Sequence, residues 1–327
     1  MMQSLPIQAI PIQSEDQWLA LRQNDVTASV AGALLGVHEY TTAYGLWAQK
    51  TGAAQDAAPE PLRFSDDETS FCVSDLERGK LLEPVALALI AKARPTWKIS
   101  APAAYYRDPE ARLGATPDAL AIDPARAGTG VLQIKTVSEH AYRRKWRDPD
   151  TLEIELPLWI AVQAAVEAEL TGASWAAVGA MVVDHKLTLH LIDIPLSRGL
   201  IERVRAEVAA FWALVEAGET PPIDYRRDGR VLARLLAQDD GGEIDLTGDA
   251  RLQALLAERA ERIARKSNDD EALKAINCEI LAKLGNAALA RCGPALICAK
   301  TVRRKEYLAK ATSYRALRVK METDHAQ

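Results

Sequence analysis

The sequence predicts a mixed α/β (α+β) fold, in which a central mixed sheet is flanked by helices and followed by a helical C-terminal extension. Three observations carry this prediction. Amphipathic segments typical of helices alternate with short apolar segments typical of strands. The apolar segments come in two pairs, each joined by a turn sequence, so each pair is expected to form a hairpin. The order helix, strand pair, helix, strand pair, helix places helices on the faces of one sheet.

The first third of the chain is predicted to be helical. One helical pattern covers residues 15–35 and ends at Gly36, a typical C-cap residue. A shorter helix is expected over residues 41–50. Residues 53–70 are rich in Ala, Pro, Asp and Glu and predict a flexible loop. A strong amphipathic helix follows over residues 75–93.

The middle of the chain contains the predicted sheet. Both hairpins are expected here, with a long helix after each. In chain order, the predicted elements are strands 113–122 and 131–136, helix 156–170, strands 177–184 and 187–194, and helix 197–216.

The chain is predicted to divide into a core, a linker and an extension. A segment with two prolines and several glycines follows the last core helix and favours a linker. The extension is expected to be helical over residues 249–284, with a terminal strand or hairpin formed by residues 294–302 and 307–319. The predicted divisions are a core at 1–217, a linker at 218–248 and a helical, basic extension at 249–327.

Composition excludes several classes of protein. The 327 residues are 48% hydrophobic and 26% charged, which is typical of a globular chain and not of a disordered one. The four cysteines form no CxxC pair, so no zinc site is predicted. No apolar run is long enough to span a membrane, and no signal peptide is recognised. We therefore expect a cytoplasmic protein with no membrane partner.

The net charge of −5 conceals an asymmetry. Residues 300–320 hold eight basic residues and one acidic residue, so this window carries +7 and the rest of the chain −12. A second basic cluster, Arg143, Arg144, Lys145 and Arg147, surrounds Trp146. Basic clusters supply most non-specific affinity for DNA phosphates, although both clusters could instead be solvated faces. Trp146 could stack on a base or simply pack in the core.

Three polar residues predict a catalytic group at the first hairpin. Gln133 and Lys135 are two apart on a predicted strand, so they point to the same face, and Asp118 follows the preceding strand. A polar pair on an otherwise apolar strand is costly unless partners satisfy it. Such a group suits metal-dependent phosphodiester hydrolysis, in which Mg²⁺, or Mn²⁺, takes oxygen ligands. Glu83, in the helix over residues 75–93, could add a second carboxylate.

An ordered series of motifs resembles a known family. It begins with Arg22-x4-Thr27-Ala28-Ser29 and continues with Gly79-x3-Glu83-Pro84. It then includes Ala115-Thr116-Pro117-Asp118, Gln133-x-Lys135-Thr136, and Gln163 in its helix. This series resembles the PD-(D/E)xK nuclease superfamily, and within it the YqaJ-like viral recombinase and lambda-type exonuclease family.

The resemblance implies a role for each matching residue. Asp118 matches the acidic metal ligand, Lys135 the catalytic lysine, Glu83 the helix glutamate near the metal, and Gln163 a glutamine that orients the site. The pocket for a DNA phosphate is matched by Arg22, Thr27 and Ser29.

The resemblance also implies an activity. Enzymes of that family degrade one strand of duplex DNA from its 5′ end, which leaves 3′ overhangs for a single-strand annealing partner. Some of them form rings around DNA, so a homo-oligomeric ring is one expectation. We expect double-stranded DNA ends as the substrate and Mg²⁺ as the cofactor.

One residue departs from the family's pattern. Gln133 stands where the family has an acidic residue two before the lysine, and an amide oxygen still ligates Mg²⁺ but brings no charge. This predicts weaker metal binding or lower activity. The alternatives are therefore a catalytically weakened DNA-end-binding accessory protein in recombination, or a restriction-type endonuclease on the same fold.

Each predicted site residue also has a plainer interpretation. Asp118 could cap a turn, Gln133 and Lys135 could form an exposed strand face, and Glu83 or Gln163 could be solvated helix residues. Thr27 or Ser29 could be the N-cap of a helix.

Overall fold

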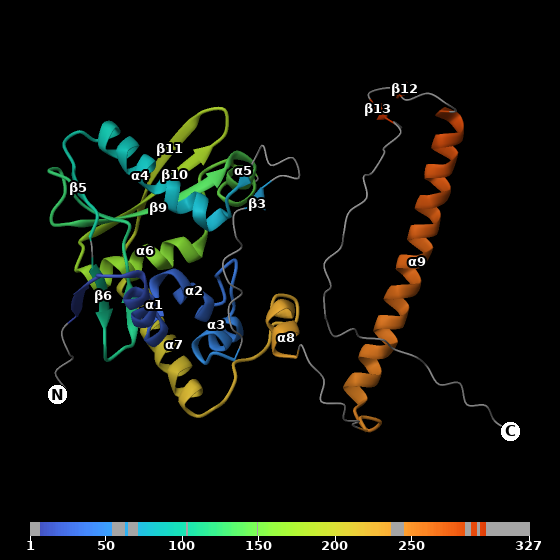
Figure 1. The fold of residues 1–327 in the computed structure, drawn as a ribbon, viewed down its shortest axis with the longest axis horizontal. Coiled ribbons are helices and arrows are strands. Elements are labelled where there is room, and N and C mark those ends of the chain that lie inside the picture. The colour runs from blue at the N-terminus through green and yellow to red at the C-terminus, as the bar shows by residue number, and fades with distance from the viewer. Residues whose placement is uncertain are drawn as a thin grey trace. The chain divides into compact units, whose positions relative to one another are not determined.

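The computed structural model describes most of the chain as two compact units, residues 1–235 and 236–327. Figure 1 shows the elements of each unit. The described residues are 7–53, 63–64, 71–102, 104–148, 150–236, 245–284, 289–292 and 295–298.

The first unit contains a five-stranded mixed sheet with the order β11-β10-β9-β8-β5. The pair β9 and β10 is parallel, whereas the other neighbours are antiparallel. This confirms both predicted hairpins. The strands are β5 (Lys98–Ser100), β8 (Ala119–Ile122), β9 (Gly130–Ser138), β10 (Trp175–Val183) and β11 (Leu187–Ile194).

A smaller four-stranded sheet has the order β1-β6-β7-β2. Here β2 and β7 are parallel and the other pairs are antiparallel. The strands are β1 (Gln8–Pro11), β2 (Val26–Thr27), β6 (Ala104–Asp108) and β7 (Leu113–Ala115).

Seven helices in the described part of the chain surround these sheets, and an eighth closes the unit. They are α1 (Glu15–Asn24), α2 (Ala28–Leu34), α3 (Ala43–Lys50), α4 (Asp75–Ala93), α5 (Glu139–Lys145), α6 (Leu158–Thr171), α7 (Arg198–Glu216) and α8 (Gly229–Leu235).

Helix α6 is central to the unit. Its Ile160, Ala164 and Ala168 pack on the five-stranded sheet, while Val162 and Val166 pack against α2 and α7. Because apolar residues lie on nearly all sides of the helix, a polar residue on it needs a partner inside the protein. Figure 1 shows α6 between the sheet strand β9 and helix α2.

The two faces of strand β9 meet different helices. Leu132 and Ile134 pack with Ala86 and Ile90 of α4. Alternation along the strand turns Gln133 and its neighbours at odd positions to the opposite face, toward α6. This alternation places the predicted polar pair against a buried helix.

The predicted helix over residues 15–35 is wrong as a single element. It is interrupted at Asp25, which has extended backbone (φ −124°, ψ 151°), and Val26 and Thr27 then form β2. The interruption has a tertiary cause, since Val26 pairs with Leu113 of β7 and the Asp25 side chain bonds to Arg107. Helical periodicity alone could not reveal it.

The predicted strand over residues 113–122 is two strands in two sheets. β7 belongs to the four-stranded sheet and β8 to the five-stranded sheet. Pro117, which has no N–H to donate to a ladder, lies between them. The break leaves Asp118 at the start of β8, beside β9.

Several other predictions are confirmed or corrected. The helix over residues 75–93 matches α4 and continues through Pro84. The short strands β1, β5 and β6 were not predicted. Within the predicted loop at 53–70, Arg63–Phe64 form strand β3, which pairs with β4 (Phe71–Cys72), and residues 54–62 and 65–70 lie outside the described residues.

The structure describes part of the predicted linker. Residues 229–235 form α8, and Asp228 is buried and accepts a hydrogen bond of 2.5 Å from Thr42. This part of the segment therefore packs on the first unit. The domain boundaries at 217 and 248 stay a prediction.

The second unit contains helix α9 (Ala250–Leu284) and the hairpin β12 (Leu289–Cys292) and β13 (Ala295–Cys298). The helix confirms the prediction for 249–284, and β13 lies within the predicted strand at 294–302. The basic window at 300–320 and the predicted segment at 307–319 lie outside the described residues. In the part of the chain that is described, no helix is both long and apolar enough to cross a membrane.

Candidate active site

Asp118 and Gln133 meet across the β8–β9 ladder. Ala119 pairs with Leu132, so Asp118 lies opposite Gln133. Asp118 Oδ2 accepts hydrogen bonds from Gln133 Nε2 (2.5 Å) and from the Ile134 backbone N–H (2.6 Å). The Gln133 nitrogen also donates to the Ile134 carbonyl at 3.3 Å. Asp118 thus bonds to strand β9 and does not cap a turn.

The side chain of Gln163 joins this group from α6. Its Oε1 accepts from Lys135 Nζ at 3.0 Å, and its Nε2 donates to Gln133 Oε1 at 2.9 Å. The same nitrogen donates to Glu167 Oε1, also at 2.9 Å. We call Gln133 and Gln163 the amide chain, because they connect Asp118 to Glu167 through successive hydrogen bonds.

This group is enclosed in the protein. Gln133 is 2% exposed, Gln163 6% and Glu167 0%, whereas Lys135 is half-buried. The alternatives of an exposed strand face and a solvated Gln163 are therefore wrong. Lys135 Nζ also lies 5.3 Å from the centre of the Trp159 ring, a cation–π arrangement that limits its movement.

Burial perturbs the acidic groups of the site. It raises the pKa of Asp118, an effect opposed by the charge of Lys135 and by the bonds from Ile134 and Gln133. It also raises the pKa of Glu167, and the nearby charge of Asp118 adds to this. Glu167 Oε2 is buried without a hydrogen-bond partner, which is rare and unfavourable for a carboxylate oxygen.

Glu83 reaches the same site from α4. Burial and the charge of Asp118 raise the pKa of Glu83 to about 7, against the opposing effect of the Lys135 charge. Glu83 therefore interacts electrostatically with both Asp118 and Lys135. We call Asp118, Glu83, Glu167 and Lys135, with the amide chain, the Asp118 site.

The three residues predicted to hold a phosphate also come together. Ser29 Oγ lies 3.3 Å from Arg22 Nη2, which donates to it, and 3.0 Å from Thr27 Oγ1. Thr27 is the N-cap of α2 by position, but its side chain makes no capping bond. Arg22 stacks on Trp18 at 4.4 Å, and Trp18 Nε1 donates to Thr116 Oγ1 at 3.0 Å, which links this pocket to the chain just before Asp118.

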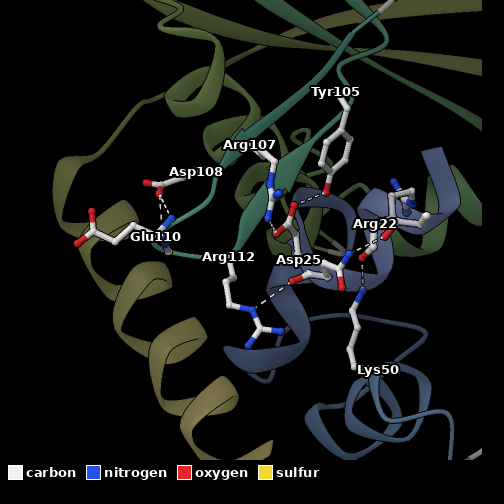
Figure 2. Close-up of polar contacts among 11 residues, drawn as sticks. Arg22, Asp25, Lys50, Tyr105, Arg107, Asp108, Glu110 and Arg112 are labelled. Carbon is white, nitrogen blue, oxygen red and sulfur yellow. Dashed lines mark hydrogen bonds and ion pairs between the residues drawn. The ribbon is translucent and has the colours of Figure 1, made fainter. Parts of the chain in front are cut away.

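The phosphate pocket is continuous with a cluster that the sequence did not predict. Asp25 is fully buried and accepts bonds from Arg107 Nη2 (2.7 Å) and Tyr105 Oη (3.1 Å). Lys50 Nζ donates to the Arg22 carbonyl at 2.6 Å. Figure 2 shows Arg107 and Tyr105 directed at Asp25, with Lys50 extending toward Arg22. We call these five residues the Asp25 cluster.

The basic residues of α5 are largely paired. Arg143 bonds to Glu139 at 2.7 Å, Arg144 Nη1 lies 3.5 Å from His140 Nε2, and Lys145 pairs with Glu39. Trp146 is 5% exposed, so the core-packing alternative is correct for it. A cavity of about 470 Å³ lies beside them, lined by Val37, Glu39, Lys145, Pro157, Leu158 and Trp159.

Sequence reasoning missed two parts of the site. Glu167 follows Gln163 by four residues, so a helical reading could have placed both on one face of α6. Asp25 and Arg107 are 82 residues apart, and no local pattern connects them.

The donor atoms at Asp118 fit a divalent cation in part. Asp118 Oδ2 and the Ile134 carbonyl are oxygens that Mg²⁺ prefers, and both face the Gln133 amide. The amide nitrogen faces them in this structure, and a half-turn of the amide would present its oxygen instead. The described residues hold no group of three His, Cys, Asp or Glu side chains placed to bind a metal.

The fold and these residues together define a class of protein. A mixed sheet with helices on both faces, an aspartate at one strand and a lysine on its neighbour match the core of the PD-(D/E)xK nucleases, but Gln133 stands where that class has an acidic residue. Residues 17–174 match the family described as the YqaJ-like viral recombinase domain. Over these residues, just under half of the chain, the protein is similar to YqaJ-like viral recombinase domains, and this similarity supports a nuclease that acts on DNA.

Solved structures resemble the chain more distantly. An alkaline exonuclease from Laribacter hongkongensis is 22% identical, with 67% of this chain and 100% of that chain covered and a TM-score of 0.43. A putative exonuclease from Eubacterium rectale is 9% identical, with 73% and 98% covered and a TM-score of 0.41. No curated protein matches the sequence. At these values the structural likeness carries no argument about substrate or mechanism.

Proposed function

We propose that the protein is a metal-dependent exonuclease that degrades the 5′ strand of linear duplex DNA. The observation that carries this proposal is the convergence of Asp118, Gln133, Lys135 and Gln163 where strands β8 and β9 meet helix α6, with Glu83 nearby. It is the group expected for hydrolysis of a phosphodiester. The expected cofactor is Mg²⁺, with Mn²⁺ as a substitute.

In this proposal the cation is held by Asp118, the Ile134 carbonyl and the oxygen of Gln133, with Glu83 as a further carboxylate. A bound divalent cation would polarise the scissile phosphate and lower the pKa of an attacking water. Lys135 contributes a positive charge beside the reacting phosphoryl group, and Gln163 holds its ammonium in place through the 3.0 Å bond. The Trp159 ring limits access of bulk water to that ammonium.

The phosphate pocket supports the proposed polarity. Arg22, Thr27 and Ser29 offer a guanidinium and two hydroxyls, which suits a terminal phosphate dianion. Lys50 adds positive charge beside them, while its burial and the charge of Arg22 lower its pKa to about 8. A 5′-phosphate bound there would place the strand end close to Asp118, since Trp18 links the two sites.

The test compares linear duplex DNA that has 5′-phosphate ends with the same DNA that has 5′-hydroxyl ends, in Mg²⁺ or Mn²⁺. We expect faster degradation from the phosphorylated end and single-stranded 3′ overhangs as product. Arg22→Ala should remove the preference, while the matched control Arg198→Ala, at an exposed arginine of α7, should keep it. Lack of degradation with every divalent metal would contradict the proposal.

Lys135 provides the second test. Lys135→Ala should abolish cleavage while DNA binding, measured by fluorescence anisotropy, stays close to that of the wild type. Cleavage of closed circular DNA into discrete fragments would instead indicate a restriction-type endonuclease, because an exonuclease needs an end.

One observation favours a second candidate function. The Gln133 nitrogen donates to Asp118, which places a hydrogen-bond donor where the proposed cation site needs an oxygen. A catalytically weakened protein that binds DNA ends in recombination would fit that arrangement. Tight end binding without degradation, together with restored degradation in Gln133→Glu, would support this candidate.

The product suggests partners for the exonuclease. A 3′ overhang is a substrate for a single-strand annealing protein, and a homo-oligomeric ring would retain the enzyme on DNA. Sedimentation of the protein alone and with duplex DNA would test the ring.

A further inference from the structure

The orientation of the Gln133 amide is fixed by Gln163, which bonds to it directly, and by the residues that bond to Gln163. Its oxygen accepts from Gln163 Nε2, so its nitrogen must face Asp118. Gln163 is fixed in turn, because Lys135 donates to its oxygen and Glu167 accepts from its nitrogen. The two amide nitrogens of the amide chain thus donate to four acceptors: Asp118, the Ile134 carbonyl, Gln133 and Glu167.

Binding of a cation requires the opposite orientation of Gln133. A cation beside Asp118 needs the amide oxygen, and a half-turn would then bring Gln133 Nε2 against Gln163 Nε2, two donors with no acceptor between them. Gln163 would have to turn as well. That second turn gives up the bond to Glu167 and points an NH₂ group at the Lys135 ammonium.

Glu167 is suited to opposing this turn. It presents Oε1 as an acceptor to Gln163 in either protonation state, because Oε2 has no partner and can carry the proton. The side chain is fully buried on α6, so water cannot replace the bond. A buried carboxyl with one unpartnered oxygen has a cost, which suggests a role for it beyond packing.

We propose that Glu167 is a positioning residue which, through Gln163, holds the Gln133 nitrogen toward Asp118 and so lowers the affinity of the site for a divalent cation. The inference rests on the proposed function, since it assumes a cation at Asp118. It applies only to a chain with an amide at position 133, because a carboxylate there has two equivalent oxygens and no orientation to hold.

A double-mutant cycle tests the inference through Mn²⁺ affinity, measured by calorimetry and by electron paramagnetic resonance without DNA. The four proteins are wild type, Glu167→Leu, Gln133→Glu and the double variant. Any charge that Glu167 carries is lost in both backgrounds, so its effect on cation binding cancels in the cycle. Loss of the positioning bond acts only where residue 133 is glutamine.

The expected result is a coupling of about five- to tenfold in the Mn²⁺ dissociation constant, the worth of one hydrogen bond. Glu167→Leu should favour binding by that factor in the wild-type background relative to the Gln133→Glu background. The same effect of Glu167→Leu in both backgrounds would overturn the inference. Glu169→Leu, two residues further along α6 at a partly exposed glutamate paired with Arg205, is the control and should show no coupling.

Further measurements distinguish a failure of the inference from a failure of the proposed function. If Glu167→Leu does not fold, Glu167→Gln replaces it, because an amide can turn with Gln163, and a coupling in the same direction is expected. Absence of Mn²⁺ binding by Gln133→Glu would overturn the cation site and the inference together. A coupling without any degradation of DNA would support the inference and contradict the proposed exonuclease.

Discussion

Two neighbouring regions of the first unit are built around a carboxylate, and they carry opposite excess charge. The Asp118 site has three carboxyl groups, Asp118, Glu83 and Glu167, against the single cation Lys135. The Asp25 cluster has one carboxylate against three cations, Arg107, Lys50 and Arg22. Burial raises the pKa of both Asp118 and Asp25, so the difference lies in what opposes it.

At Asp25, the rise in the pKa is opposed by direct bonds from a guanidinium and a phenol, and by the charge of Lys50. The charge of Asp25 is neutralised within the protein, which leaves the Asp25 cluster with an excess of positive charge. Asp118 receives bonds from neutral donors only, with Lys135 acting through its charge. The comparison shows that the Asp118 site has too few cations for its carboxyl groups and the Asp25 cluster too few anions for its cations. The proposed divalent metal and the proposed DNA phosphate would supply the missing charges.

The largest effect should come from removing the charge at Asp118. Asp118→Asn keeps an oxygen for the Ile134 N–H but deprives the cation of its carboxylate, so nuclease activity should fall by more than about a hundredfold, since even residues that only orient a metal ligand are worth about 10- to 100-fold. Stability should change by less than about 1 kcal/mol because the hydrogen bonds can be kept. Urea unfolding and a DNA degradation assay measure the two quantities.

The same substitution at Asp25 should behave in the opposite way. Asp25→Asn leaves the Arg107 guanidinium, whose side chain is 20% exposed, without its anion. We expect a loss of about 3 kcal/mol in the free energy of unfolding, the low end for a broken buried ion pair. Equal stability losses at Asp25 and Asp118 would remove the distinction between a neutralised carboxylate and an uncompensated one.

Gln133→Glu should sharpen the contrast further by adding a fourth carboxyl group to the Asp118 site. Mn²⁺ affinity and degradation rate should each rise on the order of tenfold, because ligand charge tunes the affinity of oxygen sites. Without metal, the variant should be less stable than wild type, since like charges then face each other. A variant with unchanged Mn²⁺ affinity would show that residue 133 does not limit the site.

Much of the fold could be predicted because its elements are locally encoded. Helix α4 has an amphipathic pattern along its whole length, and both hairpins carry turn residues between apolar segments. The break at Asp25 could not be predicted, because its cause is a strand partner and an arginine more than 80 residues away. Tertiary contacts there override a helical pattern that is locally acceptable.

The site was predictable to the same degree. Spacing two along a strand placed Gln133 and Lys135 on one face, and the family resemblance added Gln163 and Glu83. Spacing could not show that the Gln133 nitrogen, and not its oxygen, faces Asp118, because that choice depends on Gln163 and Glu167 on another element. The role of each residue stays a prediction until it is measured.

The smallest predicted effect concerns Glu83, whose pKa is raised from 4.5 to about 7. The folded protein holds this proton more tightly than the unfolded chain, so Glu83 contributes stability that is fully present below pH 4.5 and is lost as the pH rises through 7. Without metal, Glu83→Gln should therefore match the wild type near the acid end and exceed it at pH 8. The gain should be less than about 1 kcal/mol, because the half-buried side chain is screened by solvent.

Urea unfolding of both proteins across this pH range measures the difference, with Glu155→Gln at an exposed glutamate as the control. A divalent cation should reverse the order, because it stabilises the ionised carboxylate that burial disfavours. A Glu83 that makes no difference with or without Mn²⁺ would lie outside the Asp118 site. The carboxyl groups of the Asp118 site would then be Asp118 and Glu167 alone. The contrast with the Asp25 cluster would rest on the neutral donors of the amide chain.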